Sequence, residues 1–133
     1  RQANPRARIT LALAVLAEAG RAMLGEGGQF QATEFARKRR VPVRFLNDVI
    51  DQLTAEGLLA ELSGREGSYV LLKEPASLKV EEVIESLLGS GVGPRGVGLE
   101  TVDPAIRGVL EKASAGVDRS LQGMTIRDLV GGR

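Results

Sequence analysis

The sequence predicts a mainly α-helical fold with one small β-hairpin, and three patterns predict it. Apolar residues recur at helical spacing in three successive segments that end before residue 57. Two short stretches, LLAEL and SYVLL, then alternate with a period of two around the turn SGREG, which is typical of a hairpin. A narrow apolar stripe follows on residues 103–121. The 133 residues fit one domain with a small appendage, and they are enough to bury a core without disulfides.

The first three elements are predicted to be helices. ITLALAVLAEAG, residues 9–20, consists almost entirely of helix formers and predicts a buried helix that ends near Gly20. QATEFARKRR, residues 31–40, predicts a short helix, and Pro42 both breaks it and suits the start of the next one. The third helix, VRFLNDVIDQLTAEGLL, is capped by Gly57. Its buried face is formed by Phe45, Leu46, Val49, Ile50 and Leu53.

Two helices across a short turn, followed by a β-hairpin, form the layout of a winged helix-turn-helix. We assign it to residues 1–75 as a DNA-binding domain. The hairpin from Gly57 to Lys73 is then the wing, and Arg65 lies on its tip between Gly64 and Gly67.

The C-terminal part is predicted to hold two copies of the chain together. Residues 76–100 form a connecting helix and a glycine-rich loop, and residues 101–133 form a long helix and a tail. Asp103 before Pro104 is a strong helix start, and Thr125 with Asp128 resembles a capping box. A lone helix with an apolar stripe packs either on its own domain or on the same helix of a second copy, and we favour the homodimer. The predicted dimerisation stripe consists of Ile106, Leu110, Ala113, Val117 and Leu121.

The net charge of +1 is unevenly distributed. Through Arg44 the chain carries nine Arg and Lys against three acids (+6), and from Phe45 onward nine against fourteen (−5). The basic front half fits double-stranded DNA as a partner, although random surface asymmetry gives the same count. A winged helix used only for protein contacts is the alternative, but it would not need this charge. The predicted DNA-binding residues are Arg8, Arg37, Arg39, Arg40, Val43, Arg44, Asn47 and Arg65.

Each of these side chains has a predicted role. On the early face of the third helix, Arg44 can pair bidentately with guanine and Asn47 with adenine. At least two of the four basic residues from Arg37 to Arg40 are expected to contact phosphates, and Arg6 and Arg8, which precede the first predicted helix, could do likewise. The alternative for each is an ordinary solvated surface residue.

Several function classes are excluded by composition. The chain contains no cysteine and no histidine, which excludes disulfides, thiolate metal sites, cysteine nucleophiles and imidazole catalysis. The stretch GSGVGPRGVG lacks the Lys-Ser/Thr of a phosphate loop, so neither an enzyme nor a cofactor is expected. No apolar run approaches the roughly 18 residues of a membrane helix and no signal peptide is visible, so we expect a cytoplasmic protein without a membrane partner.

The ordered set of motifs resembles the Rrf-two-type bacterial regulators, the group that includes IscR, NsrR and CymR. The matching pieces are Glu56-Gly57-Leu58 at the helix end, the wing SGREGSYVL, the helix SLKVEEVIESLLG and the closing SLQGMTIRDLV. The resemblance spans roughly residues 9–130. It implies a homodimeric DNA-binding transcription regulator, expected to be a repressor, and leaves open whether a small molecule or a protein is its effector.

Three departures from the family pattern carry further expectations. Members with an iron–sulfur cluster have three cysteines in the region of residues 89–100; here GSGVGPRGVGLE has none, so a cluster held in that manner is not expected. Ser63 replaces the usual wing arginine, and we hypothesise that Arg65 takes over its minor-groove contact, although Glu66 argues against this. Gln31 and Lys79 replace hydroxyl residues that often cap helices, so weaker caps are expected.

Overall fold

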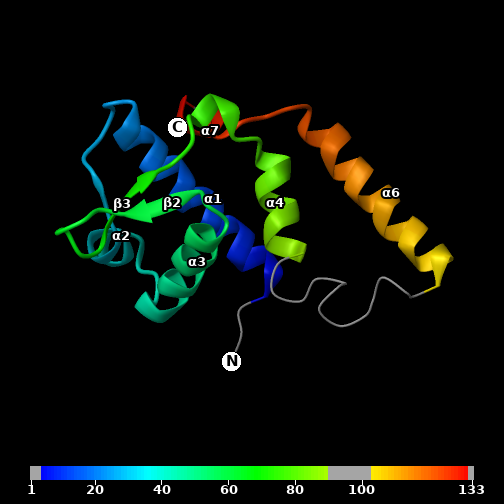
Figure 1. The fold of residues 1–133 in the computed structure, drawn as a ribbon, viewed down its shortest axis with the longest axis horizontal. Helices are drawn as coiled ribbons and strands as arrows, with labels where there is room; N and C mark the ends of the chain where they lie inside the picture. Colours follow the sequence, from blue (N-terminus) through cyan, green and yellow to red (C-terminus); the bar gives the residue numbers. More distant parts are fainter. Residues whose placement is uncertain (1–3, 90–102, 132–133) are drawn as a thin grey trace.

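The computed structural model describes residues 4–89 and 103–131. It is mainly helical with a small antiparallel sheet, as the sequence predicts. Helix α1 runs through the middle of the molecule, with the sheet, α2 and α3 on one side and α4, then α6, on the other (Figure 1). The elements are α1 (Pro5–Met23), β1 (Phe30–Gln31), α2 (Ala32–Arg39), α3 (Val43–Ala55), β2 (Leu59–Glu61), β3 (Ser68–Leu71), the 3-10 helix η1 (Pro75–Ser77), α4 (Val80–Gly89), α6 (Pro104–Leu121) and α7 (Ile126–Gly131).

The sheet contains the predicted hairpin and one strand that was not predicted. Strands β2 and β3 pair antiparallel, with Leu59 opposite Leu71. The two-residue strand β1 pairs with the other edge of β3, which gives the order β1-β3-β2. Two residues after a glycine-containing loop show no periodicity, so β1 has no signal in the sequence. It ties the start of α2 to the wing.

Helix α1 is longer than predicted at both ends. It begins at Pro5 rather than Ile9, because Asn4 Oδ1 accepts a hydrogen bond from the Ala7 N–H at 2.8 Å and proline fits the first turn. Arg6 and Arg8 therefore lie within α1 and do not precede it, which corrects that expectation. Gly20 does not end the helix: a Cβ there would lie 3.1 Å from Val130 Cγ2, so this glycine permits close packing. The helix continues to Met23.

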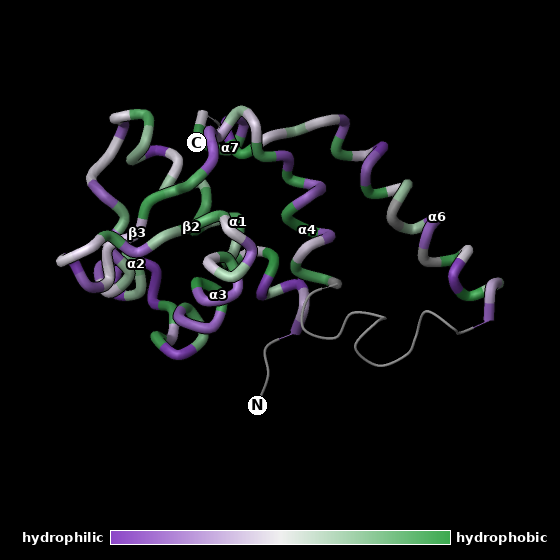
Figure 2. Tube along the Cα trace, viewed as in Figure 1, coloured by the Kyte–Doolittle hydropathy of each residue, from purple (hydrophilic) through white to green (hydrophobic). Residues whose placement is uncertain are grey.

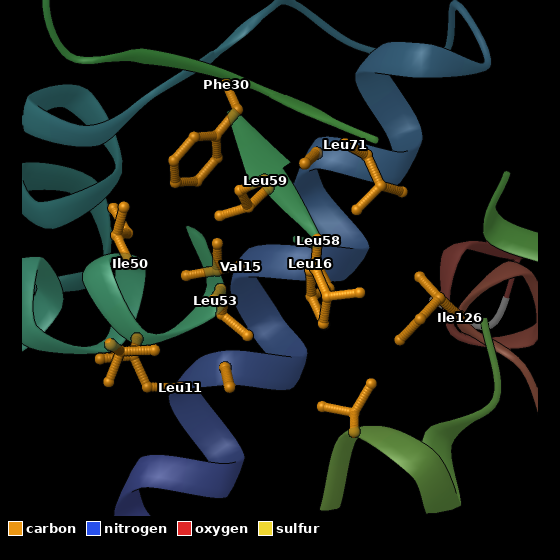
Figure 3. Packing of buried hydrophobic residues seen from close by; sticks show 14 of the residues in the cluster. Leu11, Val15, Leu16, Phe30, Ile50, Leu53, Leu58, Leu59, Leu71 and Ile126 are labelled. Atoms are coloured by element: carbon orange, nitrogen blue, oxygen red, sulfur yellow. The ribbon is translucent and has the colours of Figure 1, made fainter. Parts of the chain in front are cut away.

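The hydrophobic core surrounds α1. Figure 3 shows side chains from α1, α3 and the sheet converging, with Leu16 and Leu58 near the centre. Ile126 of α7 reaches the same core and is fully buried, and Val130 of α7 is only 2% exposed. Backbone hydrogen bonds from Val80 N to Met124 O (2.9 Å) and from Ile126 N to Leu78 O (2.9 Å) fix the C-terminal segment beside the start of α4. The C-terminal helix thus shares the core of the predicted DNA-binding domain, while the three-part division of the chain stays a prediction.

The caps of the C-terminal helices are as predicted. Asp103 Oδ1 accepts from the Ala105 N–H at 2.9 Å, with Pro104 in the first turn of α6. Asp128 Oδ2 accepts from the Thr125 N–H at 2.8 Å and so completes a capping interaction at α7. Helix α6 is the outermost helix, beside α4, and hydrophobic and hydrophilic residues alternate along it (Figure 2). None of the helices in the described part of the chain is long and apolar enough to cross a membrane.

Candidate nucleic-acid interface

The turn between α2 and α3 presents basic side chains next to the start of α3. Helix α2 ends at Arg39, and Arg40 adopts a left-handed conformation with φ 56° and ψ 47°. The Val41 N–H bonds to Ala36 O at 3.0 Å, which closes the turn. Pro42 then precedes α3, and its carbonyl accepts from the Leu46 N–H at 3.0 Å. Proline disfavours helix at the residue before it, so the chain turns sharply here and projects Arg40 outward.

Helix α3 has one buried and one exposed face, as its spacing predicts. Leu46, Val49, Ile50 and Leu53 are buried in the core. Phe45 is half-buried against the same cluster, which confirms it as a packing residue. Val43, Arg44 and Asn47 are exposed on the first turns. The N-terminal turns of α3 are therefore free to meet a ligand, which is how recognition helices contact bases.

The four basic residues of the run 37–40 differ in their surroundings. Arg37 binds Glu34, and this hydrogen bond and charge raise the pKa of Arg37 and lower that of Glu34. The Arg39 guanidinium lies 5.0 Å from the centre of the Phe35 ring, and its Nη2 lies 3.4 Å from Glu18 Oε1. Within the described residues, Arg40 has no side-chain partner, and the same holds for Arg44 on α3. Lys38 is exposed and likewise forms no ion pair or hydrogen bond with a described side chain, so Lys38, Arg40 and Arg44 are cations of this region that are not paired within the described residues.

Arg8 occupies a different place from the one expected. It is half-buried in α1, and its Nη2 donates a hydrogen bond to Gln52 Oε1 of α3. The pair fastens α1 to α3. No sequence signal joins residues 44 positions apart, so this role was missed. The hydrogen bond to Gln52 holds the Arg8 guanidinium against α3.

The wing is held to the segment before α2. Arg65 Nη1 donates to Gln29 Oε1 at 3.0 Å, which ties the hairpin tip to the residue before β1. Glu61 Oε2 accepts from the Gly67 N–H at 2.7 Å, and Gly64 and Gly67 have the positive φ values of 75° and 85° that favour glycine. These contacts fix the hairpin tip close to β1.

Gln31 caps the start of α2, where the missing hydroxyl residue predicts a weaker cap. Its Oε1 accepts from the Glu34 N–H at 2.8 Å, so α2 has a side-chain cap despite the missing hydroxyl. A Cβ on Gly67 would lie 2.9 Å from Gln31 Nε2. The glycine thus leaves room for the cap, which links the wing to α2.

The groove between α3 and the wing is acidic. It has a volume of about 610 Å³, and Asp51, Glu61, Glu66 and Tyr69 are among its lining residues. Burial and the charges of Glu61, Asp51 and Glu66 raise the pKa of Tyr69. Glu61 lies opposite Tyr69 in the strand ladder, which is the signal that could have located part of this cluster. The charge of the interface is therefore divided: the turn before α3 is basic, and the wing side of α3 is acidic.

The predicted dimerisation stripe lies along α6, and its two ends differ. Val117 and Leu121, near the α7 end, are half-buried beside α4. Ile106 is 52% exposed, and Ala113 is exposed as well. The neighbouring Val109, which was not in the predicted stripe, is 64% exposed. The side chain of Leu110 lies outside the described residues.

The α2–α3 turn, the exposed start of α3 and the hairpin after it define a winged-helix DNA-binding protein. Residues 6–132 match the model of the Rrf2 family, which is described as iron-dependent transcriptional regulator. The chain therefore belongs to the Rrf2 family of transcription regulators, as the motifs predict.

Relatives and solved structures agree with this family. An Rrf2-like HTH-type transcriptional regulator of Rhodobacter capsulatus is 34% identical over 56 residues, which are 42% of this chain and only 37% of that protein. Staphylococcus aureus CymR has a TM-score of 0.67 at 18% identity, over 93% of this chain and 95% of that chain. CymR of B. subtilis, named the global cysteine regulator, has a TM-score of 0.64 at 25% identity, over 95% of this chain and 94% of that chain. T. potens IscR has a TM-score of 0.65 at 23% identity, over 98% and 86%.

The residues of this chain do not fit a cysteine-ligated iron–sulfur cluster, although the family description names iron. The sequence contains no cysteine to supply thiolate ligands and no histidine to replace them. Across residues 4–89 and 103–131, no group of three His, Cys, Asp or Glu side chains could hold a metal ion. The glycine-rich stretch in which the family carries its cysteines lies, from residue 90 onward, outside the described residues.

Proposed function

We propose that this protein is a sequence-specific, duplex-DNA-binding transcription regulator that acts as a homodimer, without an iron–sulfur cluster, and represses by occupying its site. The observation that carries the proposal is the arrangement at the α2–α3 turn. Arg40 and Arg44 are exposed there without partners among the described residues, directly beside the open first turns of α3. A recognition helix with a basic approach is what major-groove binding needs.

The proposed contacts divide into two kinds. Arg44 and Asn47 would read base edges, with Val43 beside them for apolar contact. Arg39 and Arg40 would contact phosphates, which position the helix without selecting a sequence. Arg37 and Arg8 are already bound to Glu34 and Gln52, so we assign them smaller contributions. The acidic groove beside the wing would be repelled by phosphates, which favours docking centred on the α2–α3 turn.

The proposed dimer rests on α6. The exposed Ile106 and Val109, together with Leu88 at the end of α4, leave large apolar side chains in water on the outermost part of the molecule. Packing α6 against the same helix of a second copy would cover Ile106 and Val109 and would set two recognition helices about one DNA turn apart, roughly 34 Å. Analytical ultracentrifugation should therefore show a dimer, and Val109→Asp should shift it toward monomer, whereas Lys112→Gln on the same helix should not.

The absence of a cluster is tested directly. Protein purified anaerobically should be colourless, and its DNA affinity should not respond to oxygen, nitric oxide or chelators. The reason is the lack of thiolate ligands in the sequence. An absorbance band of an iron–sulfur cluster would contradict the proposal.

Selection of bound sequences from a random duplex pool tests DNA recognition. We expect enrichment of a two-fold symmetric site, because a homodimer presents two equivalent reading helices. If no sequence is enriched and binding is negligible at low salt, the protein is a winged-helix module for protein contacts. An enriched site without symmetry would contradict the homodimer but not DNA binding.

A further inference from the structure

An open groove lies between the first turns of α1 and the α2–α3 turn, on the other side of that turn from the acidic wing groove. Its volume is about 580 Å³, within the range of small-molecule sites, roughly 300–1,000 Å³. Leu11 and Phe35 are buried at the groove, and Ala14, Val41 and Phe45 line it half-buried. Nothing in the proposed contacts with DNA uses these apolar side chains.

The rim of the groove is positively charged. Arg6, Arg39 and Arg40 line it, and its described lining contains no Asp or Glu. Arg6 and Arg40 have no side-chain partner among the described residues, and Arg39 is held only by the Phe35 ring and by Glu18 at 3.4 Å. The positive end of the α1 dipole adds to this field, because the first turn of α1 contains no acidic residue. The rim therefore favours an anion.

The apolar walls decide which class of anion fits. A phosphate or a sugar phosphate would satisfy the guanidinium groups but would leave the half-buried Ala14, Val41 and Phe45 in contact with water. A carboxylate with an alkyl tail satisfies both parts, since guanidinium groups bind carboxylates bidentately and the tail covers the apolar walls. We propose that this groove binds an amphipathic monocarboxylate of the fatty-acid class.

Binding there would regulate DNA contact, and this part of the inference rests on the proposed function. Arg39 and Arg40 line the groove and are also the proposed phosphate contacts. A bound carboxylate would offset one of their two positive charges and would occupy the approach to the α2–α3 turn, so ligand and DNA would compete. Each ligand lowers the affinity for the other by the same factor, because coupling between two sites is reciprocal.

The first experiment measures binding without DNA. Octanoate is titrated into the full chain and followed by amide chemical shifts in nitrogen-15 spectra, with octylammonium, octan-1-ol and inorganic phosphate as comparison probes. We expect octanoate to shift the amides of Ala14 and Val41, octan-1-ol to bind at least about tenfold more weakly, and octylammonium not to bind. Failure of octanoate to bind, or equal binding of octylammonium, would overturn the proposal. Phosphate shifting the same amides as strongly as octanoate would assign the groove to phosphate and would also overturn it.

Variants separate the apolar walls from the charged rim. Ala14→Phe fills the groove, and Arg40→Asn removes a guanidinium while asparagine tolerates the left-handed backbone at this position. Both should weaken octanoate binding at least about tenfold, and Arg127→Gln on the distant α7 should leave it unchanged. Retained affinity in Ala14→Phe would refute the site; if that variant fails to fold by circular dichroism, Ala7→Phe in the same groove replaces it. If the wild type binds no octanoate and Ala14→Phe changes the sedimentation, a second copy covers the groove and the proposal is overturned.

The second experiment measures DNA affinity with and without octanoate. Octanoate should weaken DNA binding of the wild type but not of Ala14→Phe. If octanoate binds at the groove and DNA affinity does not change, the competition is refuted. If the protein binds no DNA while octanoate still shifts the groove amides, the proposed function fails and the ligand site stands.

Discussion

Truncation of Ile126 tests whether α7 is part of the core that supports the DNA-binding head. The side chain is fully buried, and its Cγ2 lies 3.6 Å from the position a Cβ would have on Gly20 of α1. Ile→Ala substitutions in cores cost about 2–5 kcal/mol, and the value rises when the site cannot collapse. Here the backbone is anchored, because the Ile126 N–H bonds to Leu78 O at 2.9 Å and the next turn carries the buried Val130. We therefore expect Ile126→Ala to cost about 3–5 kcal/mol.

Urea unfolding followed by circular dichroism measures this cost. The matched control is Met124→Ala in the same segment, because Met124 is 38% exposed and its truncation should cost less than about 1 kcal/mol. All variants are compared at equal protein concentration, since a dimer is more stable when more concentrated. If Ile126→Ala costs no more than Met124→Ala, then α7 does not share the core in solution.

Three further substitutions test separate features. Gln31→Ala removes the cap of α2 and should cost about 1 kcal/mol in urea unfolding, whereas no change would mean that the cap is not formed. Burial and the nearby Glu85 raise the pKa of Asp118 above its ordinary 3.8, so the folded state disfavours the carboxylate. Asp118→Asn should therefore stabilise the protein at neutral pH. The gain in stability should vanish below pH 3.8, where this carboxyl group is protonated in both the folded and the unfolded state. A gain that persists at that pH, or an equal gain for the exposed Glu111→Gln, would contradict this. Arg65→Ala should weaken DNA binding by about 1 kcal/mol or more, with the larger loss on A·T-rich flanks, because the arginine is expected in the minor groove. Equal affinity of the variant and the wild type on both A·T-rich and G·C-rich flanks would refute this contact and leave the arginine with Gln29.

Local patterns were sufficient for most of the fold. The spacing of Leu46, Val49, Ile50 and Leu53 identified α3 and its buried face, because a helix with one buried and one solvent-exposed face shows a clear 3.6-residue period of apolar residues. Pro42 marked the turn, since its effect on the preceding residue is purely local. The hairpin followed from period-two alternation around glycines. Asp103, Pro104 and the Thr125–Asp128 pair marked helix starts for the same reason.

The features that sequence analysis missed depend on residues far apart in the chain. Strand β1 exists because Phe30 and Gln31 meet β3, and neither residue has a local strand pattern. Gly20 looks like a helix end in isolation, yet its missing side chain makes room for α7, more than 100 residues later. In both cases packing against a distant segment overrides a weak local preference.

The candidate site shows the same limit. The exposure of Arg44 and Asn47 could be predicted, since they occupy the face of α3 opposite the core. The partners of Arg8 and Arg65 could not, because Gln52 and Gln29 meet them only in the folded chain. The acidic groove was missed because Asp51 and Glu66 belong to different elements and gather only around Tyr69. The basic front half therefore overstated how uniformly positive the DNA-facing surface is.

The central claim is that α3 reads base edges while the α2–α3 turn contacts phosphates. It is tested by measuring the affinity of wild type, Arg44→Ala, Arg40→Asn and Arg127→Gln for the selected site and for single-base variants of it, each over a series of salt concentrations. Arg40→Asn should weaken binding to all sequences alike. It should also reduce the slope of log affinity against log salt concentration by about one per subunit. Arg44→Ala should lose about 1–3 kcal/mol of discrimination at one base pair of each half-site, and Arg127→Gln should match the wild type. Uniform weakening by Arg44→Ala across all base variants, or unchanged binding in both Arg40→Asn and Arg44→Ala, would contradict the claim.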